Sequence, residues 1–358
     1  MKVALVYDRV NKWGGAEQIL LTLHEIFPNA PLFTSVYDPK NAPWAKVFRK
    51  INTSFLQKIS WTRTHHEYLA TIMPIVFESF DFSKFDLVIS VTSEAAKGII
   101  VKPPTKHFCI CLTPTRYLWS GYDIYFKNPV LNFFSKPFVK YLRKWDKIAA
   151  QKPDKLIAIS NEVNKRIKKY YQRDSEVIYP PVDLEKLGNN KQSDVKKEDY
   201  YLVVSRIVSY KKIGLVIKAF NKLGKKLYVV GAGKLLKKLK RGAKKNIIFT
   251  DFINDKKLAS IYQRAKALLI PQEEDFGIVS IESQFFKTPV IAYKKGGSYD
   301  TVVENKTGIF FEKQTVDSMV NAVKEFEKQN FLYQDLIDNA KNFSKERFKE
   351  RILSIINK

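Results

Sequence analysis

The sequence predicts an α/β protein made of two doubly wound domains, each with a parallel β-sheet between layers of helices. The chain has 358 residues, which is long for one typical domain and enough for two hydrophobic cores. Hydrophobic residues make up 45% and aromatic residues 13% of the sequence, as in a globular protein. Short apolar runs also alternate with amphipathic stretches of about ten residues, which is typical of parallel strands joined by crossover helices.

The second half of the chain shows this alternation most clearly. Runs rich in β-branched residues, such as YLVVSRI and NIIFTDF, read as strands, and the amphipathic stretches between the runs read as helices. The expected strands are 201–207, 227–233, 246–252, 267–272, 289–297 and 308–311. The expected helices are 214–223, 234–244, 255–265, 278–287, 298–304 and 315–328.

The first half repeats the pattern less regularly. A helix is expected over 16–27, and a long aromatic and basic segment at 126–153 interrupts the alternation. The expected strands are 2–8, 31–37, 86–92, 106–112 and 154–160. We therefore expect a first domain over 1–152, a second over 153–335, and a C-terminal segment over 336–358. Ser344 is a suitable N-cap for a helix in this last segment, which we expect to pack back toward the first domain.

Composition narrows the class of protein. The formal net charge is +26, from 62 Lys and Arg against 36 Asp and Glu, and residues 211–245 contain no acid. This charge fits either a solvated lysine-rich surface, or a polyanionic partner or anionic membrane. Cys109 and Cys111 lie in one apolar run without metal-ligand spacing, so we expect buried thiols in a reducing cytoplasm. No secretory signal or membrane-spanning run is evident.

Polar turns follow most of the expected strands. In open parallel sheets, ligands bind beyond the carboxyl ends of the strands. The turns combine cations, glycines and carboxylates, which suit the diphosphate and the hydroxyls of a nucleotide sugar. They are Asp8, Gly14–Gly15, Thr113–Arg116, Ser205–Arg206, Lys211–Lys212, Gly231–Gly233, Glu273–Gly277 and Gly296–Gly297.

The stretch EEDFGIVSIE (273–282) holds two carboxylates at a strand-to-helix turn. Gly277 permits a tight turn, and the free N–H groups at the start of the following helix can face a phosphate. Glu274 would lie in the turn and Glu282 one helical turn further in, where each could bind sugar hydroxyls. The alternative is that the acids only cap the helix and favour its dipole.

Several motifs together resemble the retaining glycosyltransferases of family 4, which have the GT-B fold of two Rossmann-like domains facing across a cleft. The E-x7-E motif of that family matches Glu274 and Glu282. Six further stretches follow the family pattern in order along nearly the whole chain. They are GGAEQ, AISNEVNKRIKKYY, VVSRIVSYKKIGLVIKAF, EDFGIVSIESQ, TPVIAYKKGG and TVVENKTGIFF. Within that family, the chain resembles the mannosyltransferase-like enzymes of bacterial polysaccharide synthesis.

The resemblance implies a role for each matching residue. Arg206 and Lys211 would hold the diphosphate, with Lys212 as the neighbouring candidate. Glu274 would bind hydroxyls of the donor sugar, and Glu282 the ribose. The backbone N–H groups of Phe276, Gly277, Ile278 and Val279 would face sugar and phosphate, and Gly15 would approach the diphosphate from the opposite side.

One position departs from the family. The stretch TPTRYLW (113–119) resembles a family motif in which a histidine stands where this chain has Leu112. His107 is expected to be a structural strand residue. On the acceptor side, Arg116 and Trp119 are the candidates, with His66 a further one.

The resemblance implies a metal-independent transfer of a hexose from a GDP- or UDP-sugar, with retention of anomeric configuration. No DxD-type acidic motif is evident in the sequence, no cofactor is expected, and the nucleotide sugar is a substrate. The expected acceptor is a glycan, most simply a lipid-linked one. The alternatives are another GT-B sugar-nucleotide enzyme, such as an epimerase or a phosphorylase, and a basic nucleic-acid-binding protein. The latter lacks a recognition motif, so we expect no nucleic acid partner.

Residues 126–147 interleave aromatic rings with cations, from Phe126 to Trp145 and from Lys127 to Lys147. Such a segment suits an anionic membrane surface, with the rings in the headgroup layer. The alternative is a helix that packs its rings into the first domain. We expect a cytoplasmic protein bound peripherally at the inner face of the cell membrane.

Overall fold

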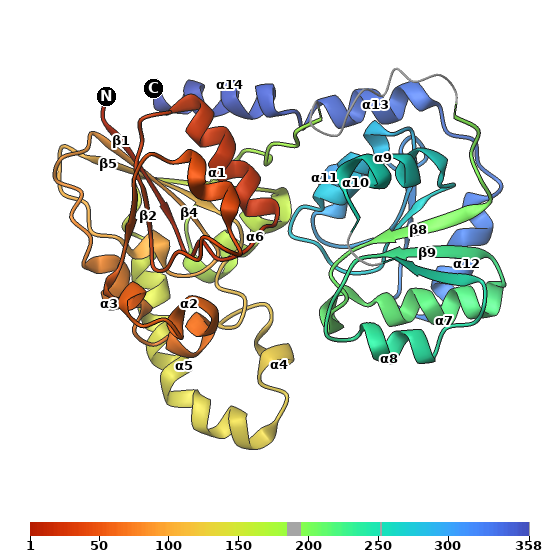
Figure 1. Ribbon diagram of the computed structural model, residues 1–358, viewed down its shortest axis with the longest axis horizontal. Coiled ribbons are helices and arrows are strands. Elements are labelled where there is room, and N and C mark those ends of the chain that lie inside the picture. The colour runs from red at the N-terminus through yellow and green to blue at the C-terminus, as the bar shows by residue number, and fades with distance from the viewer. Residues whose placement is uncertain (185–194, 251–252, 358) are drawn as a thin grey trace. The chain divides into compact units, whose positions relative to one another are not determined.

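The computed structural model describes residues 1–184, 195–250 and 253–357, and the side chains of residues 64–67 and 131 lie outside this description. The chain forms two compact units (Figure 1). The first contains Met1–Pro180 and Lys349–Lys358, and the second contains Pro181–Phe348.

The first unit is built on a seven-stranded sheet with the order β3-β2-β1-β4-β5-β6-β7, in which every pair is parallel. Its strands are β1 (Val3–Tyr7), β2 (Leu32–Thr34), β3 (Ile51–Thr53), β4 (Leu87–Thr92), β5 (Lys106–Cys111), β6 (Lys155–Ala158) and β7 (Glu176–Val177). The central strands β1 and β4 are buried along their whole length, as expected for a parallel sheet covered on both faces.

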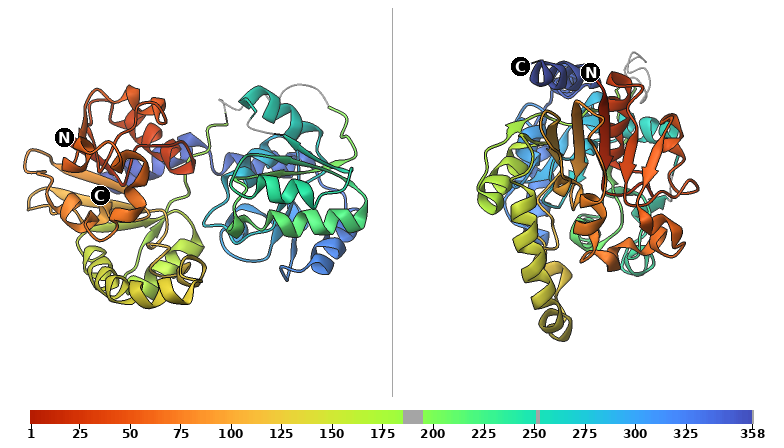
Figure 2. Two further views of the ribbon diagram at one scale, coloured as in Figure 1. Left: turned by 60° about the horizontal axis from the view of Figure 1, so that its bottom comes forward. Right: turned by 90° about the vertical axis from the view of Figure 1, so that its left-hand side faces the viewer.

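The helices of this unit include a long one, α5 (Pro129–Ala149), whose first part extends away from the sheet (Figure 1). The α-helices are α1 (Gly15–Ile26), α2 (Thr62–His65), α3 (Met73–Glu78), α4 (Tyr122–Tyr125), α5 (Pro129–Ala149) and α6 (Asn161–Tyr171). Short 3-10 helices are η1 (Pro43–Val47), η2 (Phe55–Lys58), η3 (His66–Leu69) and η4 (Ala96–Gly98). The start of α5 extends away from the sheet, together with α4 (Figures 1 and 2).

The second unit is built on a six-stranded parallel sheet with the order β10-β9-β8-β11-β12-β13. Its strands are β8 (Tyr200–Val204), β9 (Lys226–Val230), β10 (Ile247–Thr250), β11 (Leu268–Ile270), β12 (Val290–Tyr293) and β13 (Gly308–Phe311). Its helices are η5 (Ser209–Lys211), α7 (Ile213–Leu223), α8 (Leu236–Arg241), α9 (Asp255–Arg264), α10 (Ile278–Phe285), α11 (Ser298–Thr301), α12 (Val316–Phe326) and α13 (Tyr333–Lys341).

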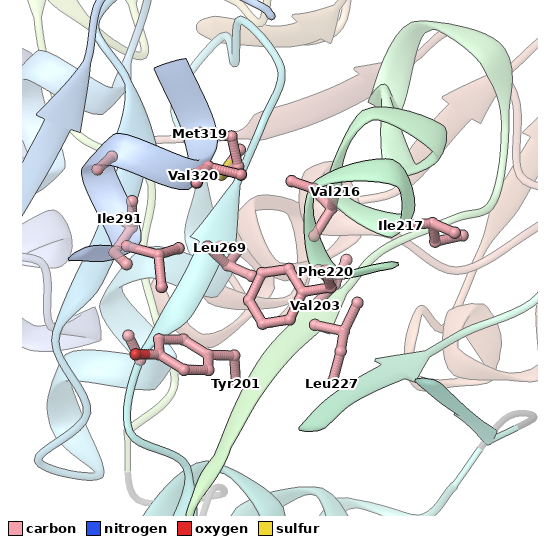
Figure 3. Packing of buried hydrophobic residues seen from close by; sticks show 14 of the residues in the cluster. Tyr201, Val203, Val216, Ile217, Phe220, Leu227, Leu269, Ile291, Met319 and Val320 are labelled. Carbon is pink, nitrogen blue, oxygen red and sulfur yellow. The ribbon is translucent and has the colours of Figure 1, made fainter. Parts of the chain in front are cut away.

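Alternate residues of β8 fill two different cores. Tyr201 and Val203 pack on one face with side chains of α7 and α12, among them Phe220 and Met319 (Figure 3). Tyr200 and Leu202 pack on the other face with side chains of α9 and α10. Helices therefore cover both faces of this sheet, which is the doubly wound arrangement that the sequence predicts.

The division between the units differs from the expected boundary at residue 152. Strand β6, expected to open the second domain, instead pairs with β5 in the first sheet, and β7 pairs with β6. The sequence signal at 154–160 is that of a strand, and a strand's sequence alone does not say which sheet it joins. The two short edge strands β3 and β7 were not predicted, because two or three partly exposed residues make no alternating pattern.

The last helix, α14 (Lys345–Ile356), joins the first unit from Lys349 onward. Ser344 caps it as expected, since its Oγ accepts a hydrogen bond from the N–H of Arg347 at 3.4 Å. Lys349 pairs with Glu25 at 2.6 Å and Arg351 with Glu176 at 2.8 Å. No helix within the described residues has the length and apolar character needed to cross a membrane.

Candidate functional site

The candidate donor site lies in the second unit, at the carboxyl ends of four adjacent strands. In the sheet order, β9, β8, β11 and β12 are neighbours, and all are parallel. The turns that follow them therefore meet at one edge of the sheet. These turns contain nearly all the residues that the sequence assigns to the donor.

Lys211 and Glu274 form the ion pair at the centre of this edge. The Nζ of Lys211 lies 2.6 Å from Oε1 of Glu274, and the two side chains are only 15% and 14% exposed. Lys212, the neighbouring candidate, is exposed, adopts a left-handed backbone conformation with φ of 53°, and precedes α7. The structure thus brings Lys211, and not Lys212, to the carboxylate.

Arg206 lies at the same edge, where a tyrosine connects it to Lys211. Its guanidinium donates a hydrogen bond to the hydroxyl of Tyr210 at 2.6 Å, and Nζ of Lys211 lies 5.6 Å from the centroid of the Tyr210 ring. The Arg206 side chain is exposed, so its charge is open to a ligand. Sequence reasoning missed Tyr210, although its place between Arg206 and Lys211 was a usable signal.

Gln272 is a second residue that sequence reasoning missed. Its side-chain amide donates a hydrogen bond to Oε1 of Glu274, the oxygen that also faces Lys211. Its own Oε1 is buried and has no hydrogen-bond partner within the described residues. Because leaving a buried acceptor unpaired costs free energy, the contact with Glu274 is held at a cost.

A glycine turn after β12 supports the backbone of Glu274. The N–H of Gly297 donates to the carbonyl of Glu274 at 2.8 Å, and Gly296 pairs with Glu274 in a parallel bridge. A Cβ on Gly296 would lie 2.5 Å from that carbonyl oxygen, and Gly296 also has a φ of 75°. Only glycine fits this position without strain.

The helix α10 begins directly after this turn. Gly277 precedes it with a φ of 100°, and the backbone N–H groups of Ile278 and Val279 lie in its first turn. Phe276 is buried, and its ring centroid lies 5.5 Å from that of Phe343, so only its backbone is available to a ligand. These positions agree with a role through main-chain groups.

Glu282 lies inside α10 in an environment that disfavours its charge. The pKa of Glu282 is raised to about 7, because burial raises it most and nearby Asp255 also raises it, while a hydrogen bond from Tyr262 lowers it. The Tyr262 hydroxyl donates that bond to Oε2 at 3.1 Å. Near neutral pH the carboxyl is therefore partly protonated, so it can both donate and accept hydrogen bonds.

In the first unit, Gly15 is the first residue of α1 and follows Gly14. Asp8, which follows β1, is held by hydrogen bonds within the fold. The Asp8 carboxylate accepts hydrogen bonds from Thr92 Oγ1 at 2.8 Å and from backbone N–H groups of residues 93–96 at 2.8–3.1 Å. Burial, with a contribution from Glu94, raises the pKa of Asp8. Asp8 thus ties the ends of β1 and β4 together, which positions the turn that leads to Gly15.

The acceptor-side candidates occupy a turn held by a buried aspartate. The indole N–H of Trp119 donates to Asp146 at 2.7 Å, and the Trp119 ring stacks on Tyr170 with centroids 5.1 Å apart. Asp146 is also paired with Lys97 at 2.6 Å, both side chains being 1% exposed. The Trp119 ring is therefore largely committed to contacts within the fold, while Arg116 lies half-buried in the same turn.

Three further positions concern histidines: His107, His66, and Leu112, which stands where the family has a histidine. His107 is buried in β5, where its Nε2 contacts Ser90 Oγ at 2.8 Å, and burial lowers its pKa to about 3. This is the structural role expected of it. Leu112 is half-buried, with its N–H bonded to the carbonyl of Thr92 at 2.8 Å. His66 begins η3, and its side chain lies outside the described part of the structure.

Among residues 1–184, 195–250 and 253–357, no three His, Cys, Asp or Glu side chains gather in a way that could hold a metal ion.

Comparison with known proteins finds similarity to glycosyltransferases. Residues 185–343 match the family model for glycosyl transferases group 1. An uncharacterized glycosyltransferase of Methanocaldococcus jannaschii is 27% identical over 209 residues, covering 57% of this chain and 58% of that protein. A GDP-mannose-dependent α-(1-6)-phosphatidylinositol monomannoside mannosyltransferase of Mycolicibacterium smegmatis is 26% identical over 174 residues, covering 41% of this chain and 46% of that protein. The chain spans less than two thirds of the length of these relatives.

Solved structures match the whole chain. The Anabaena protein HepE in complex with UDP has a TM-score of 0.73 at 15% identity, with all of both chains covered. Sucrose-phosphate synthase from Thermosynechococcus elongatus has a TM-score of 0.76 at 16% identity, covering 100% of this chain and 98% of that one. This chain has the GT-B fold. The predicted fold class is thereby confirmed, and the match to group 1 confirms the resemblance to glycosyltransferases at that level.

Proposed function

We propose that this chain is a retaining glycosyltransferase of family 4. It would transfer a hexose from a GDP- or UDP-sugar to a lipid-linked glycan acceptor in polysaccharide or glycolipid synthesis. The observation that carries the proposal is the ion pair between Lys211 and Glu274, next to the exposed guanidinium of Arg206 at the carboxyl ends of β8 and β11. Cations for a diphosphate and a carboxylate for hydroxyls thus lie together.

The proposed mechanism uses position and charge. Arg206 and Lys211 balance the negative charge that develops on the departing diphosphate, as the bond between the sugar C1 and the phosphate oxygen breaks. The same diphosphate takes the proton of the acceptor hydroxyl, and the new glycosidic bond forms on the face that the diphosphate leaves. Each well-placed contact to the developing charge lowers the activation free energy by ~3–4 kcal/mol.

Glu274 has one carboxylate oxygen engaged and one available in this arrangement. Oε1 accepts from Lys211 and Gln272, while no hydrogen bond to Oε2 is seen within the described residues. Oε2 is thus the oxygen that would accept from a donor-sugar hydroxyl, and Glu282 would bind the ribose. When the diphosphate arrives, Lys211 would be shared between the phosphate and Oε1, so sugar and phosphate recognition are linked through one ion pair.

The named relatives favour both nucleotide bases equally. HepE was solved with UDP-glucose, and the mycobacterial relative is named for GDP-mannose. A donor is identified with a thermal-shift panel of UDP-, GDP- and ADP-sugars, since a ligand of the native state raises its melting temperature. Transfer to a lipid-linked acceptor, with the anomeric configuration of the product read by NMR, then tests the proposal. A protein that none of these nucleotide sugars stabilises, or an inverted product, contradicts it.

Metal independence is part of the proposal, because Arg206 and Lys211 supply the counter-charge for the diphosphate. Activity should therefore survive excess EDTA. Loss of activity that Mg²⁺ or Mn²⁺ restores would show that a metal shares this role.

A membrane surface is the proposed location of the acceptor, and α5 carries this part of the proposal. Its apolar side chains divide into a buried set and an exposed set. Val139 and Leu142 are buried against the first unit, whereas Phe133, Phe134 and Phe138 are 68%, 67% and 58% exposed. Exposed rings of this size on one helix mark an interaction surface.

The cations of α5 lie beside these exposed rings. Lys136, Lys140 and Lys144 are exposed, so the helix combines aromatic side chains with ammonium groups, as membrane-surface helices do. Trp145 and Arg143, by contrast, face inward: Trp145 donates to Glu78 at 3.0 Å, and Arg143 to the carbonyl of Leu118 at 2.7 Å. The proposed lipid-facing surface is therefore narrower than the whole of 126–147.

A further inference from the structure

A second cationic surface lies in the other unit, on α8 and the turns beside it. Within 211–245 there is no Asp or Glu, and every Lys and Arg from 234 to 245 is exposed. We name as the basic α8 surface the following seven residues: Lys234, Lys237, Lys238, Lys240, Arg241, Lys244 and Lys245.

The apolar side of α8 packs against the core of the second unit. Leu235, Leu236 and Leu239 pack against the core that α7 and α12 share with β8. None of the seven cationic residues has an exposed apolar neighbour on the helix itself, because α8 offers only these leucines besides its basic residues. The outward face of α8 is therefore cationic without being apolar, unlike that of α5.

The cations of this surface are not balanced by the protein. No carboxylate of the described residues forms an ion pair with any of the seven, and Lys244 instead donates to the carbonyl of Asn221 at 3.1 Å. Neighbouring lysines of α7 and β9 are balanced: Lys222 pairs with Asp317 at 2.8 Å, and Lys225 with Glu327 at 2.7 Å.

Repulsion between these like charges lowers the stability of the folded protein. Lys237 and Arg241 are four residues apart on α8, Lys237 and Lys240 are three apart, and like charges at these spacings repel each other on a helix. A fold-stabilising role therefore does not account for the surface. An anionic partner does, because it would remove the repulsion.

We propose that the basic α8 surface binds the anionic headgroups of a lipid bilayer through charge alone, without insertion. It is a second attachment point, on a different unit from α5, and it stands whether or not the donor site has the proposed activity. Each cation contributes at most ~1 kcal/mol near an anionic surface, and salt screens the attraction. A nucleic acid is a less suitable partner for this surface. Proteins bind single strands through exposed aromatic rings as well as through cations, and the basic α8 surface contains no aromatic residue.

The test compares two variants of equal charge. The first carries Lys237→Gln, Lys238→Gln, Arg241→Gln and Lys244→Gln. The matched control carries Lys256→Gln, Lys306→Gln, Lys313→Gln and Lys324→Gln, which are exposed cations scattered over the same unit. Circular dichroism and thermal unfolding of the full-length variants check the fold, and a Lys238→Gln, Arg241→Gln double variant serves if the fourfold variant is unstable.

Flotation is measured with phosphatidylcholine vesicles, with and without phosphatidylglycerol, at low and high salt. We expect the α8 variant to lose at least ~10-fold in affinity for the anionic vesicles at low salt, against less than ~3-fold for the control. The remaining binding, through α5, should depend less on salt. An equal loss in both variants would reduce the effect to net charge and overturn the proposal. It is likewise overturned if the α8 variant binds as the wild type does, or if RNA competes the wild type off the vesicles.

Discussion

Glu282 occupies a part of α10 where its charged form is disfavoured, and this has a consequence for stability. Its pKa is raised from the usual 4.5 to about 7 in the folded state. In the unfolded chain the carboxyl ionises at lower pH, so its favourable contribution is complete below about 4.5 and is lost as the pH rises through 7.

We therefore expect the wild type to lose roughly 3 kcal/mol of unfolding free energy between pH 4.5 and 7.5 relative to Glu282→Gln. Urea denaturation across this range measures it. The Gln variant keeps the hydrogen bond with Tyr262 but does not titrate, so parallel pH profiles for the two proteins would contradict the assignment.

Gln272 should affect function more than stability. Gln272→Met removes the hydrogen bond to Glu274 and also the unpaired buried carbonyl, two changes of opposite sign in stability. We expect the unfolding free energy to change by less than ~1 kcal/mol, and donor affinity to fall ~10-fold as Glu274 loses a contact that orients it. Calorimetric titration with the donor identified in the panel gives the affinity. A variant that binds the donor normally would show that Gln272 does not position Glu274.

At the scale of single elements, α5 is where sequence and structure complement each other. The sequence predicted aromatic rings and cations in this segment but left open whether the rings face lipid or the first unit. The structure divides them: Phe126 packs beside Tyr122 with ring centroids 4.9 Å apart, while Phe133, Phe134 and Phe138 are exposed. Which side of a helix meets the core depends on its tertiary neighbours, which periodicity alone does not identify.

Replacing the three exposed rings tests this division. Phe133→Ser, Phe134→Ser and Phe138→Ser together should abolish the salt-resistant part of vesicle binding and leave thermal stability nearly unchanged, since none of these rings is buried. Leu332→Ser and Tyr299→Ser are suitable controls, because these residues are 71% and 55% exposed elsewhere in the chain. Undiminished binding at high salt would exclude α5 as the membrane-facing helix.

At the scale of the whole molecule, the sequence predicted the alternation of strands and helices well and the division between the units poorly. Periodicity identified β8 to β13, because each combines a β-branched run with a glycine or polar turn. Assigning β6 to a sheet required a long-range pairing with β5, which leaves no local trace. The same limit applies to the site: Arg206, Lys211 and Glu274 follow strands and were predicted, whereas Gln272 is recognisable only from its contact with Glu274.

The central claim, that Arg206 and Glu274 act on a donor sugar nucleotide, is tested most directly by turnover of two single variants. With the donor from the nucleotide-sugar panel and a lipid-linked acceptor, Glu274→Ala and Arg206→Ala should each lower kcat/KM at least ~100-fold, the loss expected for one contact to the transition state. Circular dichroism should show both variants folded, since Arg206 is exposed and Glu274→Ala keeps the backbone contacts of Glu274 and removes only its side-chain contacts with Lys211 and Gln272. Near-normal turnover in either folded variant would contradict the account.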